Sequence, residues 1–310
     1  MAKNTSLAVR EDAVAQILAE YVGQRPVEIT SDSIEQICTS FQCRVGDESF
    51  IVEFREPNMA QGLRVERFLR KKLNSVAVPI REVLADGEHE GLMYTVARKE
   101  RGRKAAELAP DEFGAALPSI LEILIALSSV DMSGTEGYGW FNHLGVGTDD
   151  TWPAHLARIK DEEPGLFFGN WHSLFESTFL DRERYDLYYS EMMNLTSGID
   201  FPRLLVQGSF GPYKVFIDNG KVSAVIDWAD ARFGDPLFDL AYMDFWPTGY
   251  KIVDLFEARC AEAGIFHKHL RKRVAVCKYY QALGSMMYFA KTHNHEAYQK
   301  VVSLGDSIRL

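Results

Sequence analysis

Residues 222–246, VSAVIDWADARFGDPLFDLAYMDFW, carry the strongest pattern in this chain. The run that ends at Asp227 is apolar and rich in β-branched residues, and the preceding KVFIDNGK contains Asn219 and Gly220, a two-residue turn signal. This pattern predicts a β-hairpin that places Asp227 at the end of its second strand. A polar stretch, QGSFGPYK at 207–214, ends thirteen residues before Asp227.

The residues before this region predict a compact, β-rich unit. Val14, Ile17 and Leu18 fall on one helical face, and Gly46-Asp47 is a turn signal between two strand-like runs. The expected elements are a helix at 11–22, strands at 27–30, 37–45 and 49–56, a helix at 62–73, and further strands between 78 and 98.

Helical periodicity dominates from Pro110 onward. The expected elements are helices at 111–130, 172–198, 252–264 and 269–293, with short strands at 202–208 and 214–228. His293 and His295 are expected on a solvated turn. We therefore predict an α+β chain with a β-rich first lobe at 1–98 and a mainly α-helical second lobe at 99–310, the latter containing the segment 204–246.

The bulk properties exclude several classes of protein. A formal net charge of −10 disfavours nonspecific nucleic-acid binding, which needs Lys and Arg to neutralise phosphates. No apolar run reaches the roughly 18 residues of a membrane helix. The four cysteines form no CxxC pair and the first residues do not resemble a signal peptide, so we expect a cytoplasmic protein with reduced thiols and no membrane partner.

The chain resembles the aminoglycoside phosphotransferase family. The IDW, GDP and DLA elements of 222–246 fall at the family spacing, and FGPYK after Gly208 aligns with the family's catalytic loop. Weaker support comes from 78–88, from 94–102 and from 133–142. The resemblance implies a bilobal, protein-kinase-like fold in which a small molecule binds between a nucleotide lobe and a helical lobe, with Asp235 and Asp239 as structural residues.

The resemblance also shows where this sequence departs from the family. The family loop reads His-Gly-Asp and, after four further residues, Asn; the Asp receives the hydroxyl proton, and the Asn and a later Asp hold magnesium. Gln207, Ser209 and Lys214 stand at the positions of His, Asp and Asn. A serine is a poor base, and an ammonium has no lone pair for a cation. Only Asp227 remains.

The third predicted strand also departs from the family pattern, at a position that binds phosphate in the family. The position of the family's phosphate-binding cation is Glu53, whose charge is expected to repel a triphosphate; Arg55, two residues on, faces the same side of the strand and leaves a register shift open. The loop SDSIEQ at 31–36 lacks the glycines that let backbone amides approach phosphates.

These departures predict that Lys214 takes the metal position and pairs with Asp227, with no metal bound. Two alternatives stay open: Asp227 caps nearby amides, or Lys214 is a functional amine. Ser209 is expected to be passive or to contact substrate, because Gln207 removes the histidine that could activate it. The candidate catalytic residues are therefore Ser209, Lys214 and Asp227, with Glu53 as a degenerate phosphate position.

The residues that face the acceptor in the resembling enzymes form the candidate substrate wall. Aromatic rings with a few carboxylates suit a cationic or partly apolar small molecule, although Tyr242 and Trp246 are equally compatible with core positions. The predicted substrate-binding residues are Gln207, Trp228, Asp230, Tyr242, Asp244 and Trp246.

Three functions are compatible with these positions. The favoured one is a kinase-fold protein that has lost phosphotransfer, needs no cofactor, and binds or transforms a small molecule. The second is an active small-molecule kinase that uses ATP and Mg²⁺ through Asp227, with Asp230 or Asp218 replacing the missing groups. The third is a noncatalytic scaffold or regulatory partner.

Overall fold

The computed structural model describes residues 9–31, 39–56, 60–73, 76–162 and 167–309. The first part of the chain is a five-stranded antiparallel sheet in the order β1-β2-β3-β5-β4. Its strands are β1 (Glu28–Ser31), β2 (Thr39–Val45), β3 (Glu48–Arg55), β4 (Val83–His89) and β5 (Leu92–Arg98). Most of the 31–36 loop lies outside the described residues.

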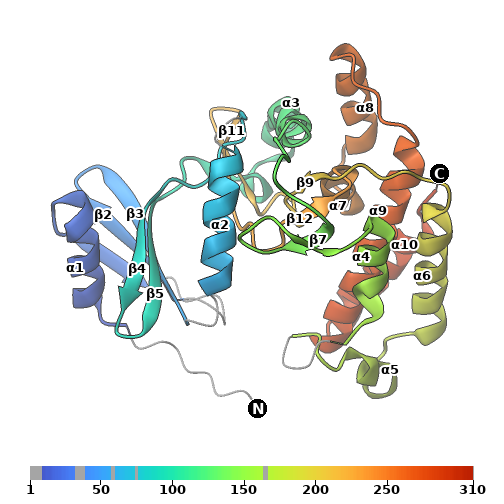
Figure 1. Ribbon diagram of the computed structural model, residues 1–310, viewed down its shortest axis with the longest axis horizontal. Coiled ribbons are helices and arrows are strands. Elements are labelled where there is room, and N and C mark those ends of the chain that lie inside the picture. The colour runs from blue at the N-terminus through green and yellow to red at the C-terminus, as the bar shows by residue number, and fades with distance from the viewer. Residues whose placement is uncertain (1–8, 32–38, 57–59, 74–75, 163–166, 310) are drawn as a thin grey trace.

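Helix α1 (Glu11–Val22) covers one face of this sheet (Figure 1). Phe50, Val52 and Phe54 alternate along β3 and pack with Val14 and Leu18 of the helix. Because strand side chains alternate between faces, Glu53 and Arg55 lie on the opposite face. The sheet thus presents charged side chains of β3 away from α1, as the alternation in the sequence predicts.

Helix α2 (Ala60–Leu73) connects the two parts of the molecule. Leu69 and Leu73 belong to the large core of the second part, and Phe68 packs on Phe141 with ring centroids 5.7 Å apart. The chain leaves the sheet at Arg98, where the lobe boundary was expected. Because α2 shares the core of the following residues, the division at residue 98 remains a prediction.

The second part is mainly helical, with two small antiparallel sheets, β11-β10-β6 and β8-β7-β12-β9. Its strands are β6 (Arg103–Lys104), β7 (Tyr138–Phe141), β8 (Gly147–Asp149), β9 (Leu204–Val206), β10 (Val215–Asp218), β11 (Lys221–Val225) and β12 (Arg232–Gly234). Its α-helices are α3 (Pro110–Leu127), α4 (Trp152–Ala157), α5 (Leu174–Ser177), α6 (Arg182–Thr196), α7 (Leu237–Phe245), α8 (Ile252–Glu262), α9 (Leu270–Lys291) and α10 (His295–Asp306). Short 3₁₀ turns occupy Ala105–Glu107, Arg158–Lys160 and Trp171–Ser173.

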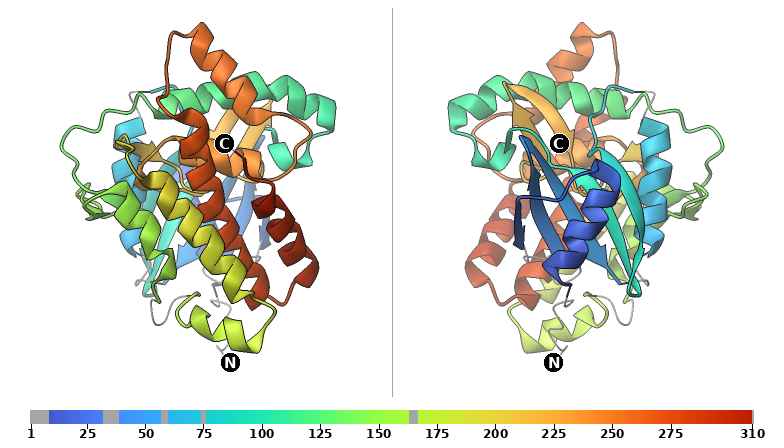
Figure 2. Two further views of the ribbon diagram at one scale, coloured as in Figure 1. Left: turned by 90° about the vertical axis from the view of Figure 1, so that its right-hand side faces the viewer. Right: turned by 90° about the vertical axis from the view of Figure 1, so that its left-hand side faces the viewer.

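Helix α9 organises the helical part. It contacts α6, α7 and α10, and α6 and α10 flank it in the left view of Figure 2. Helix α7 is almost entirely buried, so it forms the centre of the core between α9 and the loop that follows β9. Among the described helices none has the length and apolar character required to cross a bilayer.

Two helical expectations need correction. The expected helix 172–198 is interrupted, because Thr178 is extended and Asp181 starts a new helix by accepting a hydrogen bond from the Arg184 amide at 3.0 Å. His295 does not lie on a turn but begins α10, whose N-cap is Asn294. The Asn294 side chain accepts from the Ala297 amide at 3.1 Å.

Candidate functional site

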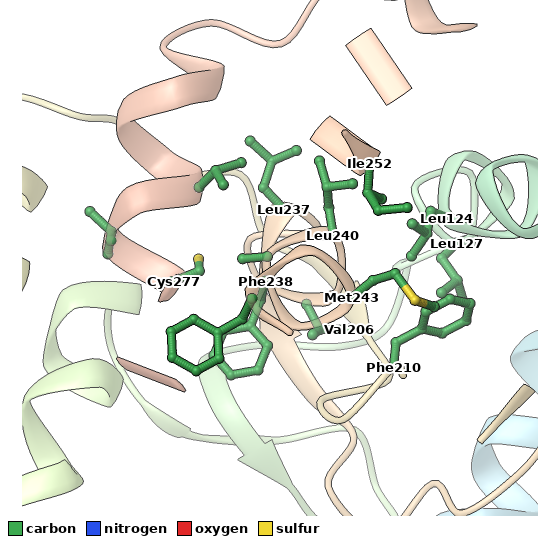
Figure 3. Close-up of a cluster of buried hydrophobic side chains, with 14 of the residues drawn as sticks. Leu124, Leu127, Val206, Phe210, Leu237, Phe238, Leu240, Met243, Ile252 and Cys277 are labelled. Atoms are coloured by element: carbon green, nitrogen blue, oxygen red, sulfur yellow. The ribbon is translucent and has the colours of Figure 1, made fainter. Parts of the chain in front are cut away.

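The loop at 207–214 follows β9, and buried side chains of the core hold it in place. Val206 and Phe210 are fully buried and lie in the cluster that also contains Met243 of α7 (Figure 3). Asp239 of α7 accepts hydrogen bonds from the amides of Gln207 and Gly208 at 2.7 and 2.8 Å. Burial raises the pKa of Asp239 to about 6, although these amides oppose the shift. Asp239 therefore fixes the loop, as the resemblance implied.

Gln207 joins this loop to the segment that carries Asp227. Its side-chain amide donates to the carbonyl of Asp227 at 2.6 Å and to that of Ile226 at 3.2 Å, and its side-chain oxygen accepts from the Ser209 amide at 2.8 Å. The residue is fully buried. The expectation that Gln207 contacts substrate is therefore corrected: it is a scaffold residue.

Ser209, at the position where the resemblance implies a base, has little contact with solvent. The residue is 7% exposed, and its Oγ is a buried atom with no hydrogen-bond partner in the described part of the chain. A serine nucleophile needs an adjacent base to remove its proton. The geometry supports the passive role expected from the sequence.

Lys214 and Asp227 form the predicted ion pair. The Lys214 ammonium contacts Asp227 Oδ2, and the two side chains are 27% and 38% exposed. The backbones also meet, because the Ile226 amide donates to the Lys214 carbonyl at 2.9 Å. Asp227 has a φ of 57°, a conformation that is uncommon for a residue with a side chain and often occurs at functional sites.

This arrangement does not fit the magnesium site of a kinase. The ammonium of Lys214 donates to the one remaining carboxylate, and a divalent cation at that oxygen would meet its positive charge. Magnesium also prefers six oxygen ligands in a regular octahedron. The described residues contain no group of three or more His, Cys, Asp or Glu side chains able to hold a metal.

Trp228, Asp230 and Tyr242 lie close to the ion pair but differ in exposure. Trp228 is 8% exposed, and its indole N–H donates to the Val225 carbonyl at 3.0 Å. Its expected role as part of the substrate wall is therefore corrected to a packing role. Asp230 is exposed, and its main chain lies against Gly208, where an added Cβ would be 2.0 Å from the Asp230 carbonyl.

Tyr242 is half-buried, and its ring lies over Gly211 of the loop. Burial raises the pKa of Tyr242; Asp230 and Asp227 add to this shift, and Lys214 opposes it. The charges of Asp230, Asp227 and Lys214 therefore all act on the phenol. Among the candidate substrate contacts, Tyr242 and Asp230 are the two that the structure brings to the ion pair.

Asp244 and Trp246 lie at the end of α7. Asp244 pairs with Lys278 of α9 and accepts from the Val253 amide at 3.3 Å, so its expected substrate contact is corrected to a structural role. Trp246 is half-buried and packs edge-to-face on Phe289 with centroids 6.3 Å apart.

Glu53 is not the isolated negative charge expected from the sequence. Its two carboxylate oxygens accept from Arg55 at 2.8 Å and from Arg81 at 2.7 Å. Burial would raise the pKa of Glu53, but Arg81 and Arg55 together lower it. The expectation of simple repulsion is therefore corrected. Sequence reasoning missed Arg81, although the residue lies in the conspicuous VPIREV stretch.

A buried polar chain behind the site was also missed. His155 of α4 is fully buried; one ring nitrogen lies 3.0 Å from Asp149, and the other lies 3.3 Å from the guanidinium of Arg232. Arg232 in turn donates from Nε to the Asp230 carbonyl at 3.0 Å. No local pattern signals this chain, because the pair of Asp149 and His155 lies far along the sequence from the pair of Asp230 and Arg232.

Known proteins are similar to this chain in both sequence and fold. Residues 38–254 match the phosphotransferase enzyme family. Over 208 residues the chain is 32% identical to hygromycin-B 4-O-kinase from Escherichia coli, a match that covers 67% of this chain and only 59% of that kinase.

Two solved structures extend the comparison. A thermostable mutant of aminoglycoside phosphotransferase APH(4)-Ia, in ternary complex with ADP and hygromycin B, has a TM-score of 0.77 and 26% identity, covering 96% of this chain and 97% of that one. APH(2")-IIa with streptomycin and ATP has a TM-score of 0.60 at 14% identity, covering 97% and 98%, and supports the fold alone. This chain belongs to the phosphotransferase enzyme family and has the kinase-like fold of the aminoglycoside phosphotransferases.

Proposed function

We propose that this chain binds a small polar molecule beside the Lys214–Asp227 pair and has lost phosphoryl transfer from Mg²⁺-ATP. The contact between the Lys214 ammonium and Asp227 supports the proposal, because the resemblance implies a metal ligand at position 214, where this chain has a cation. Ser209 adds a second argument. A base contributes about 10²- to 10⁴-fold to such a reaction, and a buried hydroxyl does not supply it.

The side chains around the pair favour a ligand with amines and hydroxyls. Asp230 is an exposed carboxylate, Tyr242 presents a phenol among charged groups, and Tyr213 beside Lys214 is 72% exposed. Carboxylates and aromatic faces both attract cationic groups. The solved relative binds hygromycin B, which makes an aminoglycoside the first ligand class to examine.

Two assays on the wild-type protein test the proposal. Thermal unfolding with hygromycin B in EDTA should show stabilisation, since a ligand of the native state raises stability by mass action. Incubation with γ-labelled ATP, Mg²⁺ and hygromycin B should give no labelled antibiotic. Labelled product that requires Mg²⁺ would overturn the proposal.

An active kinase is the second candidate, and one observation favours it: the relative that matches in sequence is named a kinase. In this case the exposed carboxylate of Asp230, whose chain lies against the loop at Gly208, would replace the base. Labelled product from the wild type, lost in Asp230→Asn and kept in Asp47→Asn, a variant of an exposed aspartate in the turn between β2 and β3, would support this candidate.

A further inference from the structure

Four charged side chains from three segments form one cluster on the face of the sheet opposite α1. Glu53 and Arg55 belong to β3, Arg81 precedes β4, and Glu100 follows β5. Arg81 contacts both glutamates, and Arg55 contacts Glu53. Their side chains are 25% exposed or less, and that of Glu100 is 3% exposed. With two arginines and two glutamates, the cluster is electrically neutral.

The carboxylate of Glu53 bridges the two guanidinium groups. Oε2 accepts from Arg55 at 2.8 Å, and Oε1 accepts from Arg81 at 2.7 Å. Guanidinium groups recognise phosphate with the same planar donors that recognise a carboxylate. Two arginines that converge on the two oxygens of one carboxylate are therefore also placed to bind two oxygens of one phosphate group.

The backbone brings this cluster next to the Lys214–Asp227 pair. Ile80 and Val225 form a parallel β-bridge, and the Val225 amide donates to the Pro79 carbonyl at 2.7 Å. Arg81 follows Ile80 and Asp227 lies two residues beyond Val225, so both segments run in the same direction from the bridge. The backbone at Arg81 therefore lies near the backbone at Asp227, on the side of the five-stranded sheet.

We infer that Arg55 and Arg81 form an oligophosphate site that the carboxylate of Glu53 closes from within the chain. The two carboxylate oxygens of Glu53 lie where two oxygens of a phosphate group would bind. Its negative charge also neutralises the arginines that would otherwise attract a phosphate. An oligophosphate must displace a carboxylate that is tethered beside the arginines and is already paired with both. The inference uses other residues than the proposed function, which depends on Lys214 and Asp227.

The experiment measures the affinity for sodium tripolyphosphate, in EDTA, by isothermal titration calorimetry. The wild type should bind weakly. Glu53→Ala should bind at least tenfold more tightly, because the cluster gains one net positive charge and Arg55 and Arg81 lose the carboxylate that they share, although Arg81 keeps its pair with Glu100. Glu53→Gln, which keeps the side-chain volume, should show a smaller gain and replaces the alanine variant if that variant does not fold.

Two controls separate this site from a general charge effect. Glu82→Ala removes a glutamate just before β4, whose side chain is 63% exposed, and should leave the affinity at the wild-type value. Adding Arg81→Ala to the Glu53 variant should abolish the gain. Wild-type binding as tight as that of the variants, no gain in either Glu53 variant, or a gain that survives Arg81→Ala would each overturn the inference. None of these results depends on whether the wild type transfers phosphate.

Discussion

The side chain of Gln207 holds the catalytic-type loop to the backbone of Asp227: its amide donates to the Asp227 carbonyl at 2.6 Å, and its oxygen accepts from the Ser209 amide at 2.8 Å. These bonds are neutral, and Gln207 itself is fully buried. They fix Asp227 relative to the loop without the side chain of Lys214. The charge at position 214 can therefore be changed while the frame of the site stays in place.

Replacing two of the three departures in the loop should create a metal site. In Ser209→Asp/Lys214→Asn the ammonium is removed, an amide oxygen at position 214 joins Asp227 as a ligand, and a carboxylate at position 209 adds negative charge, in a frame that Gln207 still holds. We expect Mn²⁺, measured by electron paramagnetic resonance, to bind at least tenfold more tightly than to the wild type. Lys214→Asn alone should change the free energy of unfolding by less than about 1 kcal/mol, because the pair is partly exposed.

The matched control for the lysine substitution is Lys221→Asn, which removes an exposed lysine from β11 with the same change of net charge as Lys214→Asn. Its Mn²⁺ affinity should equal that of the wild type. Equal Mn²⁺ affinity of the double variant and the wild type would show that Lys214 is not what prevents metal binding.

The buried pair of Asp235 and Arg273 should be a major determinant of stability. Asp235 is fully buried, Arg273 is 4% exposed, and two donors of the guanidinium reach the two carboxylate oxygens. Arg273→Met leaves an uncompensated buried carboxylate and should cost about 3–5 kcal/mol in urea unfolding. Asp235→Leu/Arg273→Met should recover part of this loss. A cost below 1 kcal/mol for the single variant would contradict the assignment.

The sequence was most informative where the determinants are local. The Asn219-Gly220 turn joins β10 and β11 as predicted, and the alternation of β3 places Glu53 and Arg55 on one face. The pairing of Lys214 with Asp227 also followed from residue types at known positions, because a lysine beside a lone carboxylate has one obvious partner.

The sequence was least informative where partners are distant along the chain. Arg81 reaches Glu53 across 28 residues, and Lys278 reaches Asp244 across 34, so neither charge could be paired without the fold. The indole of Trp228 is polar enough for a ligand wall, and only the packing shows that it faces inward. The expected cytoplasmic location and the lobe boundary at residue 98 remain predictions.

His155 should make the protein less stable in mild acid. Burial, with the Arg232 charge next in importance, lowers the pKa of His155 from 6.5 to about 3, while Asp149 opposes the shift. The unfolded chain then binds a proton that the folded chain does not, so stability is present above pH 6.5 and is lost as the pH falls toward 3. The slope in this window is at most about 1.4 kcal/mol per pH unit.

Comparison of the wild type with a His155 variant isolates the contribution of His155 to stability, because the contribution of Asp239 has the opposite pH dependence. Its pKa is raised from 3.8 to about 6, so its contribution is lost as the pH rises through that range. Urea unfolding of the wild type and His155→Gln at pH 7, 6 and 5 should give a difference that shrinks on acidification. His143→Gln, at an exposed histidine, should follow the wild type. A constant difference between wild type and His155→Gln would show that His155 binds a proton in the fold.

Trp228 and Asp230 should differ in what their replacement affects. Trp228→Phe keeps an aromatic ring in the core but loses the indole hydrogen bond to Val225, so it should cost about 1 kcal/mol in unfolding and leave hygromycin B affinity within twofold of the wild type. Asp230→Asn removes an exposed charge, while its carbonyl still accepts from Arg232. It should change stability by less than about 0.5 kcal/mol and weaken hygromycin B binding about fivefold in calorimetry. The reverse outcome, in which Trp228→Phe weakens binding and Asp230→Asn does not, would mean that the ligand reaches the ring that the fold buries.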